Sequence, residues 1–266
     1  MTPEILFRDA RFLVIDKPAG LPVHAGRAGG ASVEDFFHLW RRGKQGPWLA
    51  HRLDQDTAGC LVVALKKSAL LAAQRLFAGG GAEKTYWAVV RGVPAETAGV
   101  VNLPLVKVTL GKSWKMVGNA GTGQAAVTAW SVFGSGNGIA WLAFRPQTGR
   151  THQIRAHAAA LGHPVLGDAV YGGGAGPLML LARRIMLPLE PIVVAEAPVP
   201  AHMAAKLREC GYVAQRVRAR AVRAVPKESG MGGGAGAVGA GRKSDGDVRA
   251  RRQGGGEYRC RGAGQG

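Results

Sequence analysis

The chain has 266 residues, of which 47% are hydrophobic and 20% charged, the ordinary composition of a globular protein. No run of about 18 apolar residues predicts a membrane span, and the N-terminus lacks the pattern of a secretory signal. Cys60, Cys210 and Cys260 lie far apart without any C-x-x-C pair, which argues against a disulfide framework or a zinc site and favours a reducing, cytoplasmic location.

The positive charge is spread over the whole chain. Residues 1–214 hold 23 Lys/Arg and 13 Asp/Glu, and residues 215–266 hold 12 and 4. Both parts are therefore basic, and a polyanion is the natural partner, with nucleic acid as the first candidate. Residues 225–266 also contain 14 glycines and almost no large apolar residues, so we expect the tail to be disordered.

The N-terminal third predicts two strands and a helix. Residues 5–7 and 12–16 are short apolar runs joined by a polar turn, and the turn at residues 17–20 places Lys17 at the surface. Ser32 with Asp35 resembles a capping box, and the apolar residues that follow at helical spacing predict an amphipathic helix whose aromatic side chains belong to the core.

A polar stretch directly precedes the next buried strand. Residues 60–65 are an apolar run typical of a strand buried on both faces, yet His51, Arg52, Asp54 and Asp56 lie immediately before it. One interpretation is a structural turn in which Arg52 pairs with a carboxylate. The other is an ionised Asp54, held at the end of a rigid strand as a nucleophile or base and kept charged by a neighbouring guanidinium.

The remaining elements alternate between helices and strands. A helix over residues 68–77 ends at three glycines, and the last helix covers residues 200–211. Strands are predicted by β-propensity and glycine-rich turns. They cover residues 83–92, 100–103, 114–117, 125–133, 139–144 and 178–182.

A second polar stretch covers residues 145–155. Thr151 can cap a helix that continues through Ile154 and ends before Pro164. His152 and Arg155 lie three residues apart and share a face of this helix. A helix N-terminus with these side chains suits a phosphate or a carboxylate.

These stretches carry a family resemblance. Four stretches resemble, in chain order, the motifs of the RluA-type RNA pseudouridine synthases: DKPAGLPVHAG, HRLDQDTAG, the K-x-Y-x-A pattern at Lys84 and Tyr86, and TGRTHQIRAH with LGHPVLGDAVYG. The resemblance implies an α+β fold, with a mixed, mostly antiparallel sheet, flanking helices and a basic catalytic cleft. It also implies an isomerase that converts uridine in structured RNA, rRNA or tRNA, to pseudouridine.

The resemblance also implies roles for residues. Asp54 would be the catalytic carboxylate, Arg155 its cationic partner and Tyr86 the ring that packs on the base. Leu180 would support the site, while Leu181 replaces a histidine frequent in the family and Ala58 a hydroxyl. The expected RNA-facing residues are His51, Arg52, Arg150, Thr151 and His152.

The resemblance further implies neither a cofactor nor a metal, and we expect a monomer. Residues 1–214 would form the catalytic domain and residues 215–266 the tail. The first motif begins almost at Met1, so we expect a short form without the S4 RNA-binding domain. Two rivals stay open: a metal-dependent hydrolase, and a non-catalytic RNA-binding or ribosome-assembly protein on the same fold.

Overall fold

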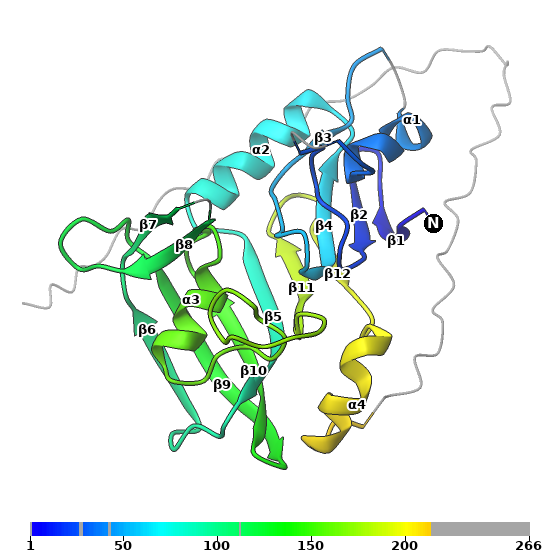
Figure 1. Ribbon diagram of the computed structural model, residues 1–266. Helices are drawn as coiled ribbons and strands as arrows, with labels where there is room; N and C mark the ends of the chain where they lie inside the picture. The colour runs from blue at the N-terminus through cyan, green and yellow to red at the C-terminus, as the bar shows by residue number, and fades with distance from the viewer. Residues whose placement is uncertain (1, 27–28, 42–43, 112, 214–266) are drawn as a thin grey trace, which may run out of the picture. The chain divides into compact units, whose positions relative to one another are not determined.

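One large β-sheet forms the centre of the protein (Figure 1). The computed structural model describes residues 2–26, 29–41, 44–111 and 113–213. The sheet order is β1 (Glu4–Arg8), β2 (Phe12–Lys17), β4 (Ala58–Ala64), β11 (Leu180–Leu187), β5 (Glu83–Arg91), β10 (Ile139–Pro146), β9 (Val127–Gly136) and β6 (Ala98–Asn102). In addition, β12 (Val193–Glu196) pairs with β11, and β3 (Trp48–Leu49) pairs with β4.

The sheet is mixed and mostly antiparallel. Among the described strands, β4 and β11 form the single parallel pair, in which Leu181 lies opposite Ala58 and Ala182 opposite Gly59. A separate antiparallel hairpin joins β7 (Leu105–Leu110) to β8 (Ser113–Gly118). The predicted α+β fold is confirmed.

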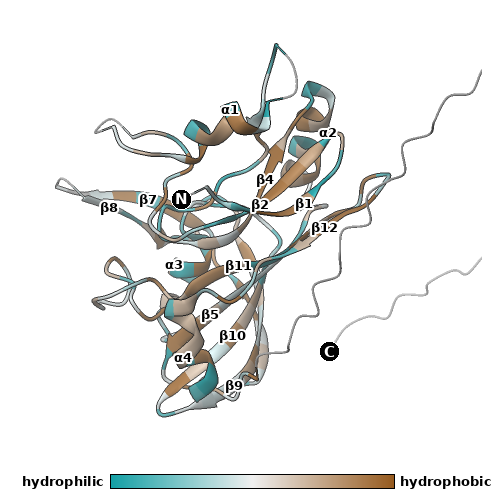
Figure 2. Cartoon of the chain, turned by 90° about the vertical axis from the view of Figure 1, so that its right-hand side faces the viewer, coloured by the Kyte–Doolittle hydropathy of each residue, from teal (hydrophilic) through white to brown (hydrophobic). Residues whose placement is uncertain are grey.

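Helices cover both faces of the sheet. Residues of α2 (Lys67–Ala78) and α4 (Ala201–Glu209) share a core with Phe12 and Val14 of β2. On the opposite face, Leu13 of β2 packs with η1 (Val33–Phe36) and α1 (Phe37–Trp40), while α3 (Gln153–Ala160) packs against β5 and β10. Because both of its faces are covered, β4 is buried along its whole length, as the sequence predicts, and most of it has a hydrophobic colour in Figure 2.

The structure differs from the predicted elements in a few places. Strands β3, β7 and β12 were not predicted. The expected helix after Ser32 is shorter and divided, with one 3₁₀ turn followed by one α-helical turn, although its aromatic residues do pack into the core as expected. The predicted tail, residues 215–266, lies outside the described residues.

Gly59 is required where β4 meets β11. Its φ is +107°, and a Cβ there would meet the backbone carbonyl of Ala182. We expect Gly59→Ala to lower the free energy of unfolding by more than about 2 kcal/mol. Gly26→Ala is the matched control, because a Cβ at Gly26 has open space. Urea unfolding measures both variants, and equal stabilities would contradict this account of the pairing.

Candidate active site

A buried lysine anchors the polar loop that precedes β4. The Nζ of Lys17 donates hydrogen bonds to the backbone carbonyls of Pro18 (2.9 Å), Leu21 (2.8 Å) and Gln55 (2.7 Å). The backbone N–H of Gly20 also donates to Gln55 (3.0 Å). The predicted surface position of Lys17 is therefore wrong: the side chain is fully buried because three carbonyls satisfy its three donors.

The charge of Lys17 is balanced by nearby carboxylates. Burial lowers the pKa of its ammonium to about 8, while Asp56, Asp54 and Asp16 act in the opposite direction. The ammonium and its hydrogen bonds fix the backbone of the loop next to Asp54. Thr57 closes the same turn, since its backbone N–H donates to the carbonyl of Asp54 (3.1 Å).

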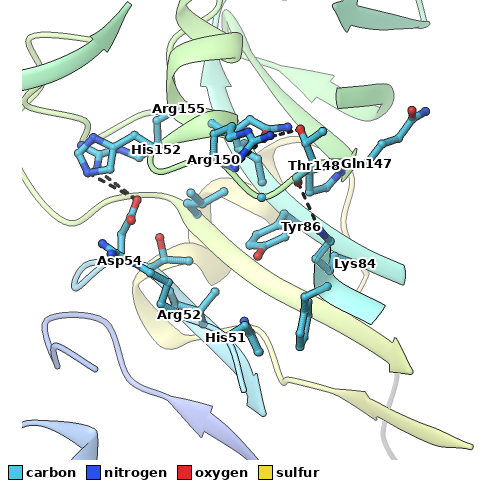
Figure 3. A pocket seen from close by; sticks show the side chains of 18 of the residues that line it. His51, Arg52, Asp54, Lys84, Tyr86, Gln147, Thr148, Arg150, His152 and Arg155 are labelled. Carbon is cyan, nitrogen blue, oxygen red and sulfur yellow. Dashed lines mark hydrogen bonds and ion pairs between the residues drawn. The ribbon is translucent and has the colours of Figure 1, made fainter. Parts of the chain in front are cut away.

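Asp54 lies beside two cationic or ionisable groups of the second polar stretch (Figure 3). Its Oδ2 is 3.5 Å from Nη1 of Arg155 and 3.8 Å from Nε2 of His152. The side chain is 19% exposed, so the carboxylate faces an opening and is not sealed in the interior. The carboxylate is therefore close to a guanidinium and also open to the pocket.

A second carboxylate holds Arg155 more tightly. Asp168 accepts two hydrogen bonds from the guanidinium, at 2.7 Å from Nε and 2.9 Å from Nη2. Asp168 Oδ1 also accepts from the backbone N–H groups of Val170 (2.9 Å) and Tyr171 (3.0 Å). These hydrogen bonds outweigh burial, so the pKa of Asp168 lies below its ordinary value and that of Arg155 above.

The sequence analysis did not identify Asp168 as part of the site. It lies in the GDAVYG segment of the third motif, 13 residues after Arg155, and no regular spacing connects the two. A carboxylate in a glycine-rich turn is ordinarily a turn residue, and Asp168 also has that role through its bonds to Val170 and Tyr171. Only the tertiary structure shows the ion pair.

The helix that carries Arg155 begins later than predicted. Thr151 does not cap it; α3 starts at Gln153, and His152 is the N-cap residue with φ +52°. Gln153 instead ties down the chain before the helix, because its Oε1 accepts hydrogen bonds from Thr148 Oγ1 (2.7 Å) and Arg150 N–H (2.9 Å). The turn before α3 is thus fixed by an amide side chain.

A pocket of about 430 Å³ opens between Asp54 and β5. Tyr86 of β5 and Leu180 of β11 both line it, as does Ile154 of α3. Burial raises the pKa of the Tyr86 phenol well above its ordinary value, and the negative charge of Asp54 contributes, so this phenol is protonated at neutral pH. The expected residues Asp54, Tyr86, Arg155 and Leu180 therefore meet at one cavity.

The predicted RNA-facing residues occupy different surroundings. Arg52 is exposed and, within the described part of the chain, forms no ion pair with a carboxylate. Arg150 also lines the pocket, and its Nε donates to the carbonyl of Ala125 (3.0 Å). Thr151 is half-buried and is not among the residues that line this pocket.

His51 has a structural contact as well as a place at the pocket. Its Nε2 accepts a hydrogen bond from the backbone N–H of Val62 (3.0 Å), and its ring lies 4.6 Å from that of Phe77. Burial lowers the pKa of His51 to about 4, helped by the charge of Lys84, so the imidazole is neutral at physiological pH. It supplies no positive charge to the wall.

Two further features concern the described residues only. They include no group of three or more His, Cys, Asp or Glu side chains that could hold a metal ion. None of their helices has the length and apolarity needed to cross a lipid bilayer.

Comparison with known proteins decides the family. Residues 11–160 match the model of the RNA pseudouridylate synthase family. An uncharacterised RNA pseudouridine synthase of Zymomonas mobilis is 41% identical over 210 residues, which cover 75% of this chain and 95% of the relative. The chain belongs to the RNA pseudouridylate synthase family.

Other relatives agree with this assignment. Ribosomal large subunit pseudouridine synthase C of Buchnera aphidicola is 33% identical over 168 residues, covering 63% of this synthase and 54% of the relative. The solved structure of human RNA pseudouridylate synthase domain containing 4 superposes with a TM-score of 0.66 at 29% identity, covering 77% of this synthase and 92% of that chain. The synthase is therefore an isomerase that modifies RNA, as the motifs predict.

The Asp168–Arg155 pair should be a large contributor to the stability of the synthase. Asp168→Ala leaves the buried guanidinium with only its longer, 3.5 Å contact to Asp54, and we expect a loss of about 3–5 kcal/mol in the free energy of unfolding. Glu196→Ala is the control, since Glu196 is 52% exposed in its pair with Arg183 and should cost at most about 1 kcal/mol.

Urea unfolding across pH checks this prediction. Because the folded pKa of Asp168 lies below the ordinary value of 3.8, its contribution is present above that value and is lost as the pH falls further. A loss for Asp168→Ala no larger than that for Glu196→Ala would contradict the assignment.

Proposed function

We propose that Asp54 is the carboxylate that acts on the sugar of the target uridine. Pseudouridine formation breaks the N1–C1′ bond, turns the base and joins C5 to C1′; C5 loses a proton and N1 ends with one, so the product is an isomer. Positive charge develops on the sugar as in glycoside cleavage, and one carboxylate near C1′ stabilises it. The position of the half-buried Asp54 at the edge of the pocket, 3.5 Å from Arg155, is the observation that supports this role.

Asp54 can act by either of two routes, attack on C1′ or removal of the 2′ proton. In both routes Arg155 keeps the carboxylate ionised and oriented, and Asp168 keeps the guanidinium in place. Tyr86 packs its ring against the uracil, a contact worth about 1–3 kcal/mol per base. Since its phenol is protonated, Tyr86 contributes stacking and hydrogen bonding to the site.

A uridine in a stem-loop must leave its stack to enter the pocket. Extrusion costs a few kcal/mol. Protein contacts with the position that the uridine leaves in the RNA stack, and with the RNA backbone, must offset this cost. The exposed Arg52 at the pocket suits a contact with the position that the uridine leaves, while Arg150 suits a contact with an RNA phosphate. The half-buried, neutral His51 contributes its shape, and no charge, to this wall.

We propose ribosomal RNA as the substrate class, acted on in the cytoplasm by a monomer. The support is that relatives from Buchnera aphidicola and Pasteurella multocida are named ribosomal large subunit pseudouridine synthases. Mapping pseudouridines in total RNA from a deletion strain names the target. A lost modification in a tRNA stem-loop would replace this proposal, and no lost modification would favour a non-catalytic assembly protein.

Asp54→Asn tests the central role. The amide keeps the shape of the side chain but removes the charge, so we expect a folded protein that binds RNA with near-normal affinity and forms no measurable pseudouridine. Asp35→Asn, at the start of η1, is the matched control and should keep full turnover, because Asp35 bonds to Ser32 away from the pocket. Turnover by Asp54→Asn at more than about 1% of the wild-type rate would overturn the assignment.

The tail is proposed to raise RNA affinity through its charge. Residues 215–266 carry a net charge of +8 beyond a catalytic domain that we place at residues 1–214. Deleting residues 226–266 should weaken RNA binding and flatten its dependence on salt, since fewer phosphate counterions are released. Binding measured from 50 to 200 mM salt checks this, and an unchanged slope would exclude the tail from RNA binding.

A further inference from the structure

The backbone of His152 has an unusual conformation next to Asp54. Its φ of +52° places it in the left-handed region, which among the described non-glycine residues only Asn137 shares. Such a conformation costs about 1–3 kcal/mol and persists where the surroundings require it. Its effect here is to direct the imidazole away from α3 and toward Asp54, with Nε2 3.8 Å from Oδ2 (Figure 3).

Two aromatic side chains fix the plane of this imidazole. Trp114 of β8 stacks on it with a centroid distance of 4.7 Å and an interplanar angle of 20°. Tyr171 meets its edge at 5.8 Å and 81°. The side chain is only 13% exposed, so little freedom remains for rotation. A residue that only contacted RNA phosphates would not need this packing.

The hydrogen bonds of Tyr171 determine which nitrogen carries the proton. Its Oη accepts a bond from the backbone N–H of Met116 (2.9 Å) and lies 3.2 Å from Nδ1 of His152. If the phenol donates to Nδ1, the phenolic proton has an acceptor and the imidazole proton is on Nε2, which faces Asp54 at 3.8 Å. In the other tautomer, Nδ1 carries the proton and cannot accept one from the phenol. The lone pair of Nε2 would then face a carboxylate.

The charges around the imidazole are consistent with a neutral ring. Burial is the main influence and lowers the pKa of His152, while Asp54 and Asp168 raise it and Arg155 and Arg52 lower it. In the neutral state the Nε2 proton is the one available to Asp54. Both Arg155 and His152 approach the same oxygen of Asp54, Oδ2.

We propose that His152 is a positioning residue for Asp54, with its tautomer set by Tyr171 and its plane by Trp114. Together with Arg155 it holds Oδ2, so that Oδ1 is the oxygen presented to the nucleotide sugar. The distances of 3.5 and 3.8 Å are longer than those of an ideal hydrogen bond, and catalytic contacts of this length can shorten in a complex with substrate. The inference rests on the proposed role of Asp54 and gives His152 a task other than the RNA contact expected from the sequence.

Single-turnover kinetics on a stem-loop RNA containing the mapped target uridine test the proposal. His152→Ala should lower the rate at saturating enzyme about 100-fold, with less than about a threefold change in the half-saturating concentration. His152→Gln, whose amide N–H can replace Nε2–H, should have a rate at least about tenfold higher than that of His152→Ala. A normal rate with weakened saturation would make His152 an RNA contact and overturn the proposal.

Tyr171→Phe tests whether Tyr171 sets the tautomer of His152, and it leaves the strained backbone at His152 unchanged. It should lower the saturating rate about tenfold alone, yet change it little when added to His152→Ala, because the two side chains act as a unit. Tyr212→Phe is the control, since the Tyr212 ring packs on Trp87 and Trp141 and is not among the pocket residues. The proposed role of Tyr171 would be refuted if Tyr171→Phe lowered the saturating rate by the same factor in the wild-type and His152→Ala backgrounds. It would also be refuted if Tyr171→Phe alone left the rate unchanged.

Asp54→Asn separates this inference from the proposed function. If Asp54→Asn is inactive while the His152 and Tyr171 variants turn over normally, the positioning role of His152 is refuted and the role of Asp54 stands. If Asp54→Asn keeps its turnover, both fail.

Discussion

The site depends on one guanidinium shared between two carboxylates. Arg155 forms a close, two-pronged pair with the buried Asp168 and a longer contact with the half-exposed Asp54. The first pair supplies rigidity, because a buried charge without a partner is costly. The second leaves Asp54 charged and accessible. An arginine held by Asp54 alone would be free to move with it, and the carboxylate would lose a fixed reference.

The sheet order brings the parts of the site together from distant segments. Asp54 precedes β4, Tyr86 belongs to β5 and Arg155 follows β10, yet β11 is the only strand between β4 and β5. Gly59 permits the close parallel approach of β4 to β11, and Lys17 secures the loop that precedes β4. Residues that lack any chemical role thus determine where Asp54 lies in the wall of the pocket.

The sequence predicts the parts of this protein that repeat a simple pattern. The apolar run of β4 and the β-propensity of the residues in β5 and β10 identify the central strands, and the motifs identify Asp54, Tyr86 and Arg155 as neighbours. β7 was not predicted, although residues 106–110 alternate between apolar and polar as in a half-buried strand; it pairs with β8 in a hairpin separate from the main sheet. Lys17 was misplaced because a lysine after a strand is normally solvated, and its three carbonyl acceptors lie partly in a segment 38 residues away. Asp168 and the tautomer of His152 follow from tertiary contacts that no spacing encodes.

The most direct test of the account is a crystal structure of the protein with its target RNA carrying 5-fluorouridine at the modified position. Fluorine at C5 removes the proton whose loss completes the reaction, so the nucleotide should remain trapped at the site. The account predicts an extruded nucleotide with its ring on Tyr86 and its C1′ or C2′ within contact distance of Oδ1 of Asp54. A nucleotide seated in the pocket with its sugar turned away from Asp54, or contacted through Oδ2, would contradict it.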